Sequence, residues 1–388
     1  MADVLFVGLG FGGLYTLRHL LSDLPPGTRV VAIDQRDRFV FTPLLYEYLT
    51  GELEPDVVAP PYETLIPTDR VELLRDEVVR VDLGTDAVYL ESGERIEFDA
   101  LVLAPGSVPA FHGVAGAERH AVPFYSFEDA DRLGTTLRVG EWAGGTRPAC
   151  VVGGGVVGIE LAFALAELLE RSGHPPGRTP VIVLEAMADI LREQSDGLRA
   201  LARRKLEAAG IEVRTSVKVL EVEGDEVEVA AGDGSERLDA AAVAWAAGTE
   251  PNPLLQQLPA ERFGRHGVRV EPTLQLPGHP NVFVLGDAIS YPGRAEGAPL
   301  PDTAQAAFQQ SEVAAKNLRA WLEGEEPRVR YRYGHLGDFL RISRREAIAD
   351  IRGVVLDGGA ASLARRAAYL FRMPDWAIRT SAIRQWLG

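Results

Sequence analysis

The chain has 388 residues, a formal net charge of −16 and a single cysteine, Cys150. The length predicts two or three domains, and the acidic balance argues against nucleic acid as a partner. One cysteine excludes an intramolecular disulfide, a CxxC redox pair and a cysteine-ligated iron–sulfur cluster. The seven histidines are scattered singly and predict no metal site.

The first motif follows the N-terminal apolar run, which predicts a β-strand and no secretory signal. In VLFVGLGFGGLYTLRHLL, Gly8, Gly10 and Gly13 stand in GxGxxG order between this run and a helix-periodic stretch. The order predicts a strand, a tight turn and a helix that binds a dinucleotide pyrophosphate at its N-terminus. The next predicted strand, RVVAID, ends at Asp34, whose carboxylate can accept ribose hydroxyls. A glycine-rich turn without a ligand is the alternative.

The same pattern recurs later in the chain. ACVVGGGVVGIELAFALAELL places Gly153, Gly155 and Gly158 between a predicted strand and helix, and PVIVLEA ends the next strand at Glu185. Two bound dinucleotides are therefore expected. A carboxylate at Glu185 repels a 2′-phosphate, which favours NADH over NADPH; a surface glutamate at a strand end would remove this preference.

Short alternating strands are predicted over residues 71–104 and again over 213–248, at equivalent places after the two motifs. The duplication therefore covers whole domains. HPNVFVLGDA then predicts a strand followed by Gly286 and Asp287. An extended flavin needs a contact to its ribityl and pyrophosphate region, which Asp287 can supply; an ordinary Gly-Asp turn is the alternative.

The stretch DTAQAAFQQS predicts a helix from about Ala304, capped by Thr303. Its positive end would stabilise negative charge on a flavin ring. Gln305 and Gln309 are four positions apart and project to one side, where their amides can donate to quinone carbonyl oxygens. Two solvent-facing glutamines on a surface helix are the alternative.

The C-terminal part is basic, with 12 Arg, no Lys and five acidic residues from Arg328 onward. Two amphipathic helices are predicted, over 363–373 and 376–387, and the first carries Leu363 and Phe371 on the face opposite Arg365. Such a helix pair suits the surface of an anionic membrane. A hairpin packed on the protein body or against a second subunit is an equal alternative.

Together these motifs resemble the type II NADH:quinone oxidoreductases, flavoproteins with two dinucleotide-binding domains. The resemblance rests on GLGFGGLYTLRHL, IDQRDRFVFTPLLYEYLTGEL, VVGGGVVGIELAFALAEL, VFVLGDA and TAQAAFQQS. DQRDRF and LARRAAYLFRMPDW resemble its demethylphylloquinone reductase subgroup. Related disulfide reductases and sulfide:quinone oxidoreductases need cysteines near the flavin, which this chain lacks. One departure is Ala104-Pro105-Gly106, where the superfamily usually has Ala-Thr-Gly.

The resemblance implies an α/β fold with two Rossmann-like, glutathione-reductase-like domains and a C-terminal amphipathic helical segment. We expect an FAD-binding domain over 1–115 and 250–325, an NADH-binding domain over 116–249, and a C-terminal domain over 326–388. Glu160, Gln305 and Gln309 are the implied catalytic residues, with Glu160 supplying protons to the quinone; a first-turn glutamate facing the helix dipole is the alternative. The implied cofactor-binding residues are Gly8, Gly10, Phe11, Gly12, Gly13, Asp34, Gln35, Pro43, Val79, Ala104, Pro105, Gly106, Gly153, Gly155, Gly158, Glu185, Gly248, Gly286, Asp287 and Ala304.

The expected activity is transfer of a hydride from NADH to FAD and then of two electrons to a membrane quinone, a naphthoquinone, without proton pumping. The expected location is the cytoplasmic face of the membrane, with the basic C-terminal segment on its anionic surface and a homodimer as a possible assembly. Two alternatives remain open: a reductase of a ferredoxin- or rubredoxin-like carrier, and an NADH-sensing flavoprotein.

Overall fold

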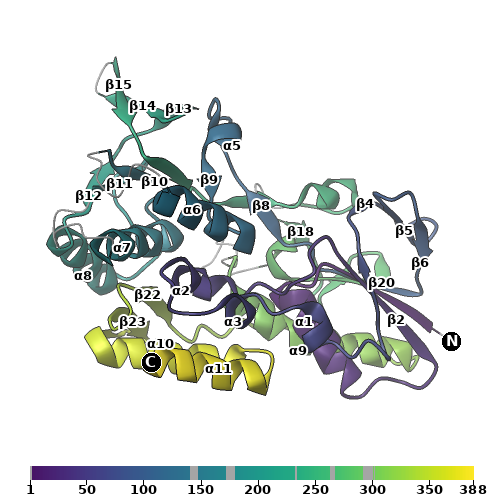
Figure 1. The fold of residues 1–388 in the computed structure, drawn as a ribbon. Helices are drawn as coiled ribbons and strands as arrows, with labels where there is room; N and C mark the ends of the chain where they lie inside the picture. The colour runs from purple at the N-terminus through teal and green to yellow at the C-terminus, as the bar shows by residue number, and fades with distance from the viewer. Residues whose placement is uncertain are drawn as a thin grey trace. The chain divides into compact units, whose positions relative to one another are not determined.

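The computed structural model describes residues 2–139, 147–171, 180–231, 234–262, 267–291, 300 and 302–388. They form two compact units (Figure 1). The first unit comprises Met1–Val40, Ala59–Val108 and Thr249–His335, and the second comprises Phe41–Val58, Pro109–Gly248 and Leu336–Gly388. Most of the predicted C-terminal domain thus groups with the second unit, as do residues 41–58. The assignment of cofactors to domains stays a prediction.

The first unit is built on a six-stranded sheet in the order β19-β20-β7-β1-β2-β3. Its strands are parallel except β19, and β1 pairs with both β2 and β7, so that Val4 is level with Val30 and Ala100. The inner parts of its central strands, residues 4–7, 30–33 and 100–103, are apolar and buried, which is typical of a sheet covered on both faces. The strands are β1 (Ala2–Val7), β2 (Thr28–Asp34), β3 (Glu72–Arg75), β7 (Ala100–Leu103), β19 (Gln275–Leu276) and β20 (His279–Val284).

Helices α1 (Phe11–Leu21) and α9 (Ala304–Leu322) lie side by side in this unit (Figure 1). The predicted strand–turn–helix and the helix start at Ala304 are therefore confirmed. The alternating strands predicted over 71–104 include an antiparallel sheet in the order β4-β5-β6. The other elements are β4 (Val78–Asp82), β5 (Ala87–Leu90), β6 (Arg95–Glu97), β8 (Ser107–Pro109), β17 (Thr249–Pro251), β18 (Val268–Arg269), β21 (Ile289–Ser290), α4 (Tyr62–Leu65), η3 (Pro253–Gln257) and η4 (Gly286–Ala288).

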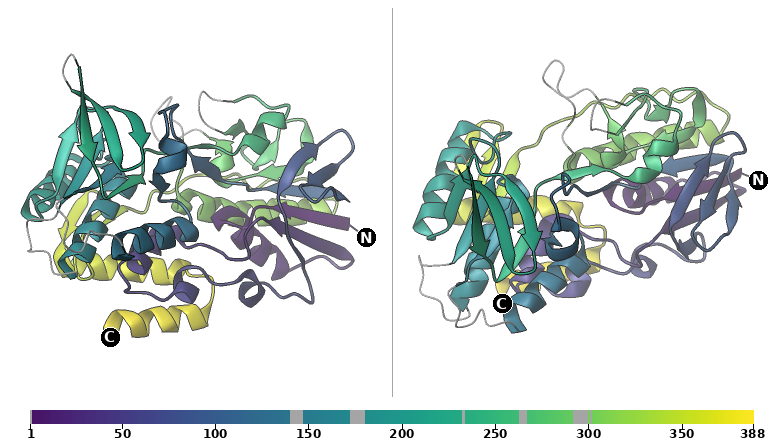
Figure 2. Two further views of the ribbon diagram at one scale, coloured as in Figure 1. Left: turned by 45° about the horizontal axis from the view of Figure 1, so that its top comes forward. Right: turned by 90° about the horizontal axis from the view of Figure 1, so that it is seen from above.

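The second unit contains a five-stranded parallel sheet in the order β12-β11-β10-β16-β9. It repeats the strand–loop–helix–strand arrangement of the first unit, and an antiparallel sheet of β13, β14 and β15 follows (green in Figure 2). Its elements up to β16 are η1 (Thr42–Leu44), α2 (Leu45–Leu49), α3 (Pro55–Val58), α5 (Ala117–His120), β9 (Val122–Pro123), α6 (Phe127–Val139), β10 (Ala149–Val152), α7 (Val156–Arg171), β11 (Val181–Glu185), α8 (Asp196–Ala208), β12 (Glu212–Thr215), β13 (Val219–Glu223), β14 (Glu226–Ala231), β15 (Gly234–Asp239) and β16 (Ala242–Trp245).

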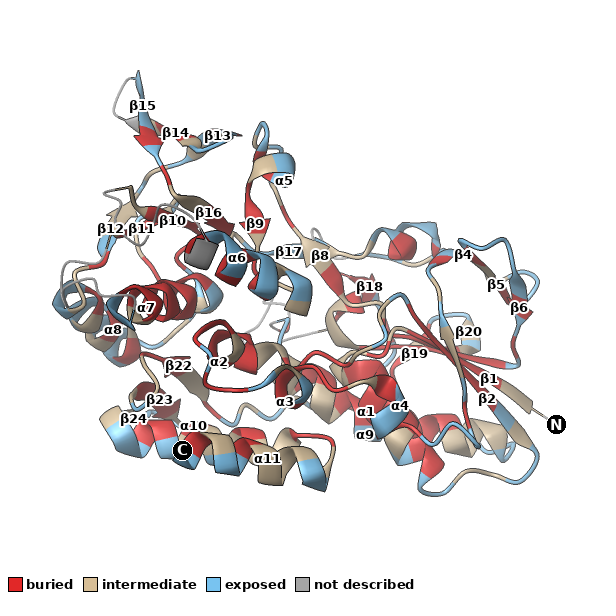
Figure 3. Cartoon of the chain, in the orientation of Figure 1, coloured by how far each residue is buried: buried red, intermediate tan, exposed pale blue. Residues whose placement is uncertain are grey.

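The C-terminal part of the second unit contains an antiparallel sheet that the sequence did not predict, formed by β22 (Asp338–Arg341), β23 (Ala347–Ile351) and β24 (Val354–Asp357). Helices α10 (Gly358–Arg372) and α11 (Trp376–Leu387) follow, and α10 packs on β23. Both were predicted, although α10 begins before residue 363. Figure 3 shows buried and exposed residues alternating along the two helices.

Candidate functional site

The first glycine loop connects β1 to α1. Gly8 has a φ of +86°, and a Cβ there would lie 2.3 Å from the carbonyl oxygen of Ala104, so this position requires glycine. A Cβ at Gly13 would lie 1.9 Å from the Gly8 carbonyl oxygen. Around Gly10, in contrast, a Cβ would meet no atom within 4 Å, and this N-cap residue has no side chain to bind the first-turn N–H groups. Open space in front of uncapped N–H groups fits a pyrophosphate.

Asp34 ends β2 beside this loop and is almost fully buried. Its Oδ2 accepts hydrogen bonds from the Leu9 backbone N–H at 2.7 Å and the Tyr62 hydroxyl at 3.2 Å, and its Oδ1 accepts from the Arg36 N–H at 2.9 Å. Burial and the Asp34 carboxylate raise the pKa of Tyr62 well above its usual value. Asp34 therefore holds the loop in place. Its predicted hydrogen bonds from ribose hydroxyls would have to share the carboxylate oxygens that already accept these bonds.

The second glycine loop, between β10 and α7, has the same construction. Gly153 has a φ of +115°, and a Cβ there would lie 2.2 Å from the Ala246 carbonyl oxygen. A Cβ at Gly158 would lie 1.9 Å from the Gly153 carbonyl oxygen, whereas one at Gly155 would meet nothing within 4 Å. The two loops therefore offer the same open position to a ligand.

Glu185 ends β11 as Asp34 ends β2. Its Oε2 accepts from the Gly154 N–H at 2.6 Å, and its Oε1 accepts from the Met187 N–H at 2.7 Å. A carboxylate has about four acceptor positions. The two bonds found here leave acceptor capacity on both oxygens, which fits two ribose hydroxyls.

The turn after β20 places the half-buried Asp287 in the first unit. The Ser107 hydroxyl donates to its Oδ2 at 2.9 Å, and burial, partly offset by this bond, raises the pKa of Asp287. The Gly286 N–H donates to Oε1 of Gln310 at 2.6 Å. Gln310 is fully buried and was not among the predicted residues, although it directly follows Gln309 in the same motif. It holds the turn that presents Asp287.

Thr303 caps α9 as predicted, since its hydroxyl accepts from the Ala306 N–H at 3.2 Å. The side chain of Gln309 donates to the Gly334 carbonyl oxygen at 2.7 Å and accepts from the Gly334 N–H at 2.9 Å. Gln305 accepts from the Tyr333 hydroxyl at 3.4 Å. Both amides therefore bind the segment around Gly334, and donation to a quinone, which stays a prediction, requires these bonds to be shared or opened.

Glu160 lies in the first turns of α7 and is buried in the second unit. Its Oε1 accepts from the Arg341 backbone N–H at 2.6 Å. Burial raises the pKa of Glu160 to about 7, against the opposing effect of the Arg365 guanidinium. The Tyr46 hydroxyl is hydrogen-bonded to this carboxyl, and burial together with Glu160 raises the pKa of Tyr46. A carboxyl with a pKa near neutrality can both take up and release protons at physiological pH.

The structure gives Glu160 neighbours that the sequence did not predict. Arg365 of α10 is buried and ion-paired with Glu47 of α2, at 2.6 Å between Nη1 and Oε1. This pair could not be predicted from the sequence, because the two residues are 318 positions apart. The motif FTPLLYE did contain Glu47, but its helix-to-helix partner cannot be recognised from local spacing.

The remaining predicted cofactor residues occupy the same two units. Ala104, Pro105 and Gly106 follow β7, and the Ala104 carbonyl oxygen lies beside Gly8. The Asn252 amide donates to the Pro105 carbonyl oxygen at 3.4 Å. Gln35 follows Asp34 and is exposed, and Val79 in β4 is 43% exposed. These residues, with Phe11, Gly12, Gly286, Asp287 and Ala304, are in the first unit, whereas Pro43 and Gly248 are in the second.

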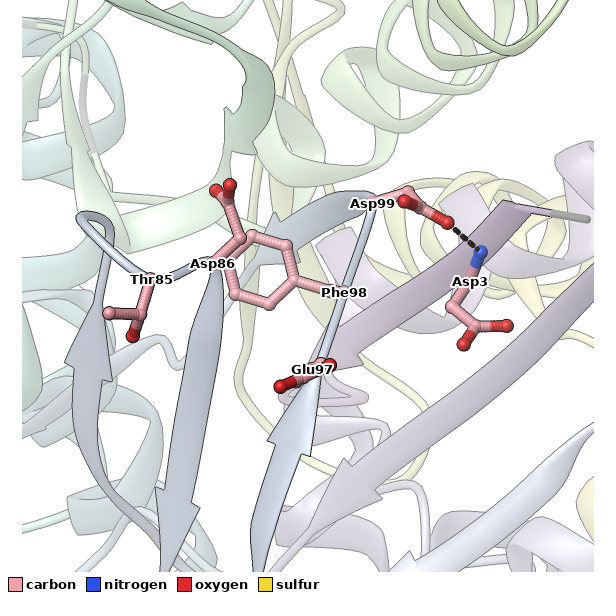
Figure 4. Close-up of a pocket in the computed structure, with 6 residues that line it drawn as sticks. All are labelled: Asp3, Thr85, Asp86, Glu97, Phe98 and Asp99. Carbon is pink, nitrogen blue, oxygen red and sulfur yellow. Dashed lines mark hydrogen bonds between the residues drawn. The ribbon is translucent and has the colours of Figure 1, made fainter.

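A separate pocket in the first unit is lined by Asp3, Thr85, Asp86, Glu97, Phe98 and Asp99 (Figure 4). The Asp3 N–H donates to the Asp99 carboxylate at 2.7 Å within it. The pocket contains none of the predicted site residues. In the described part of the chain, no group of three or more His, Cys, Asp or Glu side chains is arranged to hold a metal ion. None of the helices described there is long and apolar enough to cross a membrane.

Comparison with known proteins agrees with this arrangement. The family model for pyridine nucleotide-disulphide oxidoreductases matches residues 2–311. Demethylphylloquinone reductase NdbB of Synechocystis is 34% identical over 99% of this chain and 95% of its own length. Type II NADH:quinone oxidoreductase Ndh of Mycobacterium tuberculosis is 28% identical over 99% of this chain and 87% of its own length.

Structural comparison gives the same fold. The solved structure of NDH2 from Plasmodium falciparum in complex with NADH has a TM-score of 0.86 and covers 100% of this chain and 97% of its own, at 16% identity. The two Rossmann-like sheets and the C-terminal helices predicted from the sequence are thereby confirmed. The chain belongs to the pyridine nucleotide-disulphide oxidoreductases and, within them, to the type II NADH:quinone oxidoreductase family of enzymes.

Proposed function

We propose that this enzyme oxidises NADH and reduces a membrane quinone of the naphthoquinone class, with FAD as the resident cofactor. Support for the acceptor comes from family membership and from NdbB, a relative named as a demethylphylloquinone reductase. When bound, FAD would accept a hydride from NADH and deliver two electrons to the quinone. The protein supplies binding, orientation and protons.

The observation that carries the proposal is the duplicated loop-and-acid geometry in a chain without a cysteine pair. Gly10 and Gly155 are both open toward a ligand, and Asp34 and Glu185 both end the next strand. Cys150 lies fully buried in β10, where burial raises the pKa of its thiol to about 12. A thiol of this kind is not a nucleophile at neutral pH. Electrons therefore pass to an acceptor outside the chain.

The first unit would hold FAD through the Gly8–Gly13 loop, Asp34 and Asp287. The second would hold NADH through the Gly153–Gly158 loop and Glu185, whose negative charge disfavours the 2′-phosphate of NADPH. The two bonds that Glu185 accepts leave acceptor positions on both of its oxygens for the ribose hydroxyls of NADH.

Quinone reduction consumes protons as well as electrons, and Glu160 would hold and release one. Its buried carboxyl has a pKa of about 7, and its Oε1 is fixed by the Arg341 N–H. Gln305 and Gln309 would orient the quinone carbonyl oxygens once their bonds to Tyr333 and Gly334 are shared.

The proposed location is the surface of an anionic membrane, at its cytoplasmic face, and the C-terminal helices support the contact with the membrane surface. Leu363 and Phe371 of α10 are 71% and 80% exposed, and Trp376 and Leu387 of α11 are 72% and 83% exposed. The apolar face of α10 is therefore not packed on its own unit. Exposed leucine and aromatic side chains beside arginines are typical of helices that lie in a membrane interface. A homodimer contact is the competing use of this face.

Rapid mixing of the flavin-loaded protein with NADH, and then with menadione as a naphthoquinone, tests the proposal. We expect the flavin absorbance to bleach with NADH and to return with menadione. Gln309→Ala should slow the return and leave the bleaching rate unchanged, with the exposed Gln35→Ala in parallel to report effects on flavin binding. Return with a ferredoxin- or rubredoxin-like carrier but not with menadione would refute the quinone acceptor. A persistent long-wavelength band with negligible turnover would indicate an NADH sensor.

A further inference from the structure

The interior of the second unit contains a cluster of charged side chains drawn from three helices, one strand and one loop. We call it the Glu–Arg cluster and define it by its acids on α2, the following loop and α7, and its bases on β22 and α10. Its members are Glu47, Glu52, Glu160, Glu167, Arg341, Arg365 and Arg366. Burying so many ionisable groups is unfavourable unless each has a partner. The arrangement of the partners therefore indicates what the cluster does.

The pair formed by Glu47 and Arg365 is almost completely enclosed, with side chains 1% and 3% exposed. Arg365 Nη1 donates to Oε1 of Glu47 at 2.6 Å and Nη2 donates to Oε2 at 3.3 Å, so the contact uses both carboxylate oxygens. Nη2 also donates to the Pro43 carbonyl oxygen at 3.1 Å, and the guanidinium lies over the ring of Tyr369 at 4.7 Å. A two-pronged contact fixes orientation as well as charge.

Arg341 links the rest of the cluster to Glu160. Its Nη2 donates to Glu52 and, at 2.8 Å, to Oε2 of Glu167, while its backbone N–H donates to Oε1 of Glu160 at 2.6 Å. Two carboxylates thus hold the Arg341 side chain, and the Arg341 backbone N–H binds the carboxylate of Glu160. Glu160 is consequently attached to a residue whose position the cluster fixes.

Charged and titratable groups face Glu160 from three elements. Tyr46 and Glu47 come from α2, Arg341 comes from β22, and Arg365 and Tyr369 come from α10. Strands β10 and β11 also pack on α7, but their titratable residues interact elsewhere: Cys150 with Arg214 and Glu212, and Glu185 with the Gly154 and Met187 N–H groups. Arg365 and Glu47 therefore act on Glu160 with opposite signs.

We propose that Arg365 is a positioning residue for the reaction: its two-pronged contact with Glu47 fixes helix α2, whose adjacent Tyr46 is hydrogen-bonded to the Glu160 carboxyl, and so holds that carboxyl in place for proton exchange. The inference rests on the proposed role of Glu160 and extends it to a helix outside the two glycine loops. Helix α10 then has two roles, because Leu363 and Phe371 lie on its exposed side while Arg365 is buried in the interior. Removal of the C-terminal helices changes the environment of Glu160 as well as any contact with lipid.

Two single substitutions and their combination test the inference through the sign of their effects. Arg365→Gln removes a cation and leaves the Glu47 carboxylate, so the pKa of Glu160 should rise by about 1 pH unit or more. Glu47→Gln leaves Arg365 without its counter-charge, so this pKa should fall. The double variant, Glu47→Gln with Arg365→Gln, should return toward the wild-type value, and Arg365→Lys should preserve much of it. Arg204→Gln, an exposed arginine on α8, is the matched control and should change nothing.

The measurement is infrared titration of the protonated carboxyl band that Glu160→Gln abolishes, performed on the flavin-loaded protein without NADH or quinone. The pH profile of menadione reduction is recorded in parallel. The inference is supported if the titration midpoint of Glu160 rises in Arg365→Gln and falls in Glu47→Gln. If one of these variants fails to fold, the direction of the shift in the other still tests the inference. Unmoved midpoints, or shifts in the same direction, overturn it. The expected order of midpoints without any menadione reduction would refute the proposed function and leave the positioning role intact.

Discussion

Replacement of Gly10 by alanine separates ligand binding from folding at the first glycine loop. A Cβ at Gly10 meets no atom within 4 Å, and the residue has a φ of −70° and a ψ of −160°, which alanine also adopts. Alanine is a poorer helix N-cap than glycine, which destabilises the folded state, but it lowers the entropy of the unfolded chain, which stabilises the folded state. Each effect changes the free energy of unfolding by less than about 1 kcal/mol. The apoprotein should therefore keep its stability to within about 1 kcal/mol.

Flavin binding should respond differently, because the open space at Gly10 is where we place the pyrophosphate. Forcing a methyl group into a packed contact costs about 1–3 kcal/mol, which corresponds to roughly 5- to 150-fold weaker binding. The assay is a titration of refolded apoprotein with FAD, followed by quenching of flavin fluorescence, alongside a urea unfolding curve for each apoprotein.

The second glycine loop supplies the matched control for this experiment. Gly155→Ala places a Cβ in equally open space and should weaken NADH while leaving flavin affinity unchanged. Gly13→Ala should instead destabilise the fold, since its Cβ would lie 1.9 Å from the Gly8 carbonyl oxygen. Wild-type flavin affinity in Gly10→Ala, or an equal loss in Gly155→Ala, would refute the assignment of the first loop to FAD.

Three further predictions concern other parts of the site. Burial raises the pKa of Glu160 from 4.5 to about 7, so the wild-type protein loses stability as the pH rises through this range. Glu160→Gln should therefore be more stable than the wild type by up to about 3 kcal/mol at pH 8 and no more stable below pH 4.5. Urea unfolding at each pH measures this difference. Replacing Leu363 and Phe371 with serine should reduce co-sedimentation with anionic liposomes at least tenfold without changing stability by more than about 1 kcal/mol, and undiminished binding would contradict the membrane-surface assignment. Glu185→Gln should raise the ratio of NADPH to NADH turnover about tenfold, whereas an unchanged ratio would mean that this carboxylate does not select the cofactor.

Local patterns predicted the elements around both glycine loops. A strand, a turn that needs glycine and a helix are determined within about 20 residues, and the structure confirms this unit from Ala2 to Leu21 and again from Ala149 to Arg171. The cap at Thr303 is equally local, because its hydroxyl reaches the N–H three residues later. Features whose partners lie within one turn or one strand can be recognised from spacing alone.

Features that depend on distant partners were not predicted. The contact of Gln309 with Gly334 depends on a loop 25 residues away, and the pair of Glu47 with Arg365 spans 318 residues. The spacing of Gln305 and Gln309 indicated a shared helix face but not what lies against it. The sheet formed by β22, β23 and β24 was also not predicted, because its strands are only 4 or 5 residues long and too short to give a clear alternating pattern.

Helix α10 shows why amphipathicity does not determine which face of a helix is buried. Its leucine and phenylalanine face was expected to meet either lipid or the protein body, with Arg365 on the opposite side. Leu363 and Phe371 are exposed, whereas Arg365 is buried. A buried guanidinium is tolerated because Glu47 provides a counter-charge and the Pro43 carbonyl oxygen an acceptor. The pair with Glu47 of α2 thus stabilises the orientation of α10 in which Arg365 is buried and the apolar face is exposed.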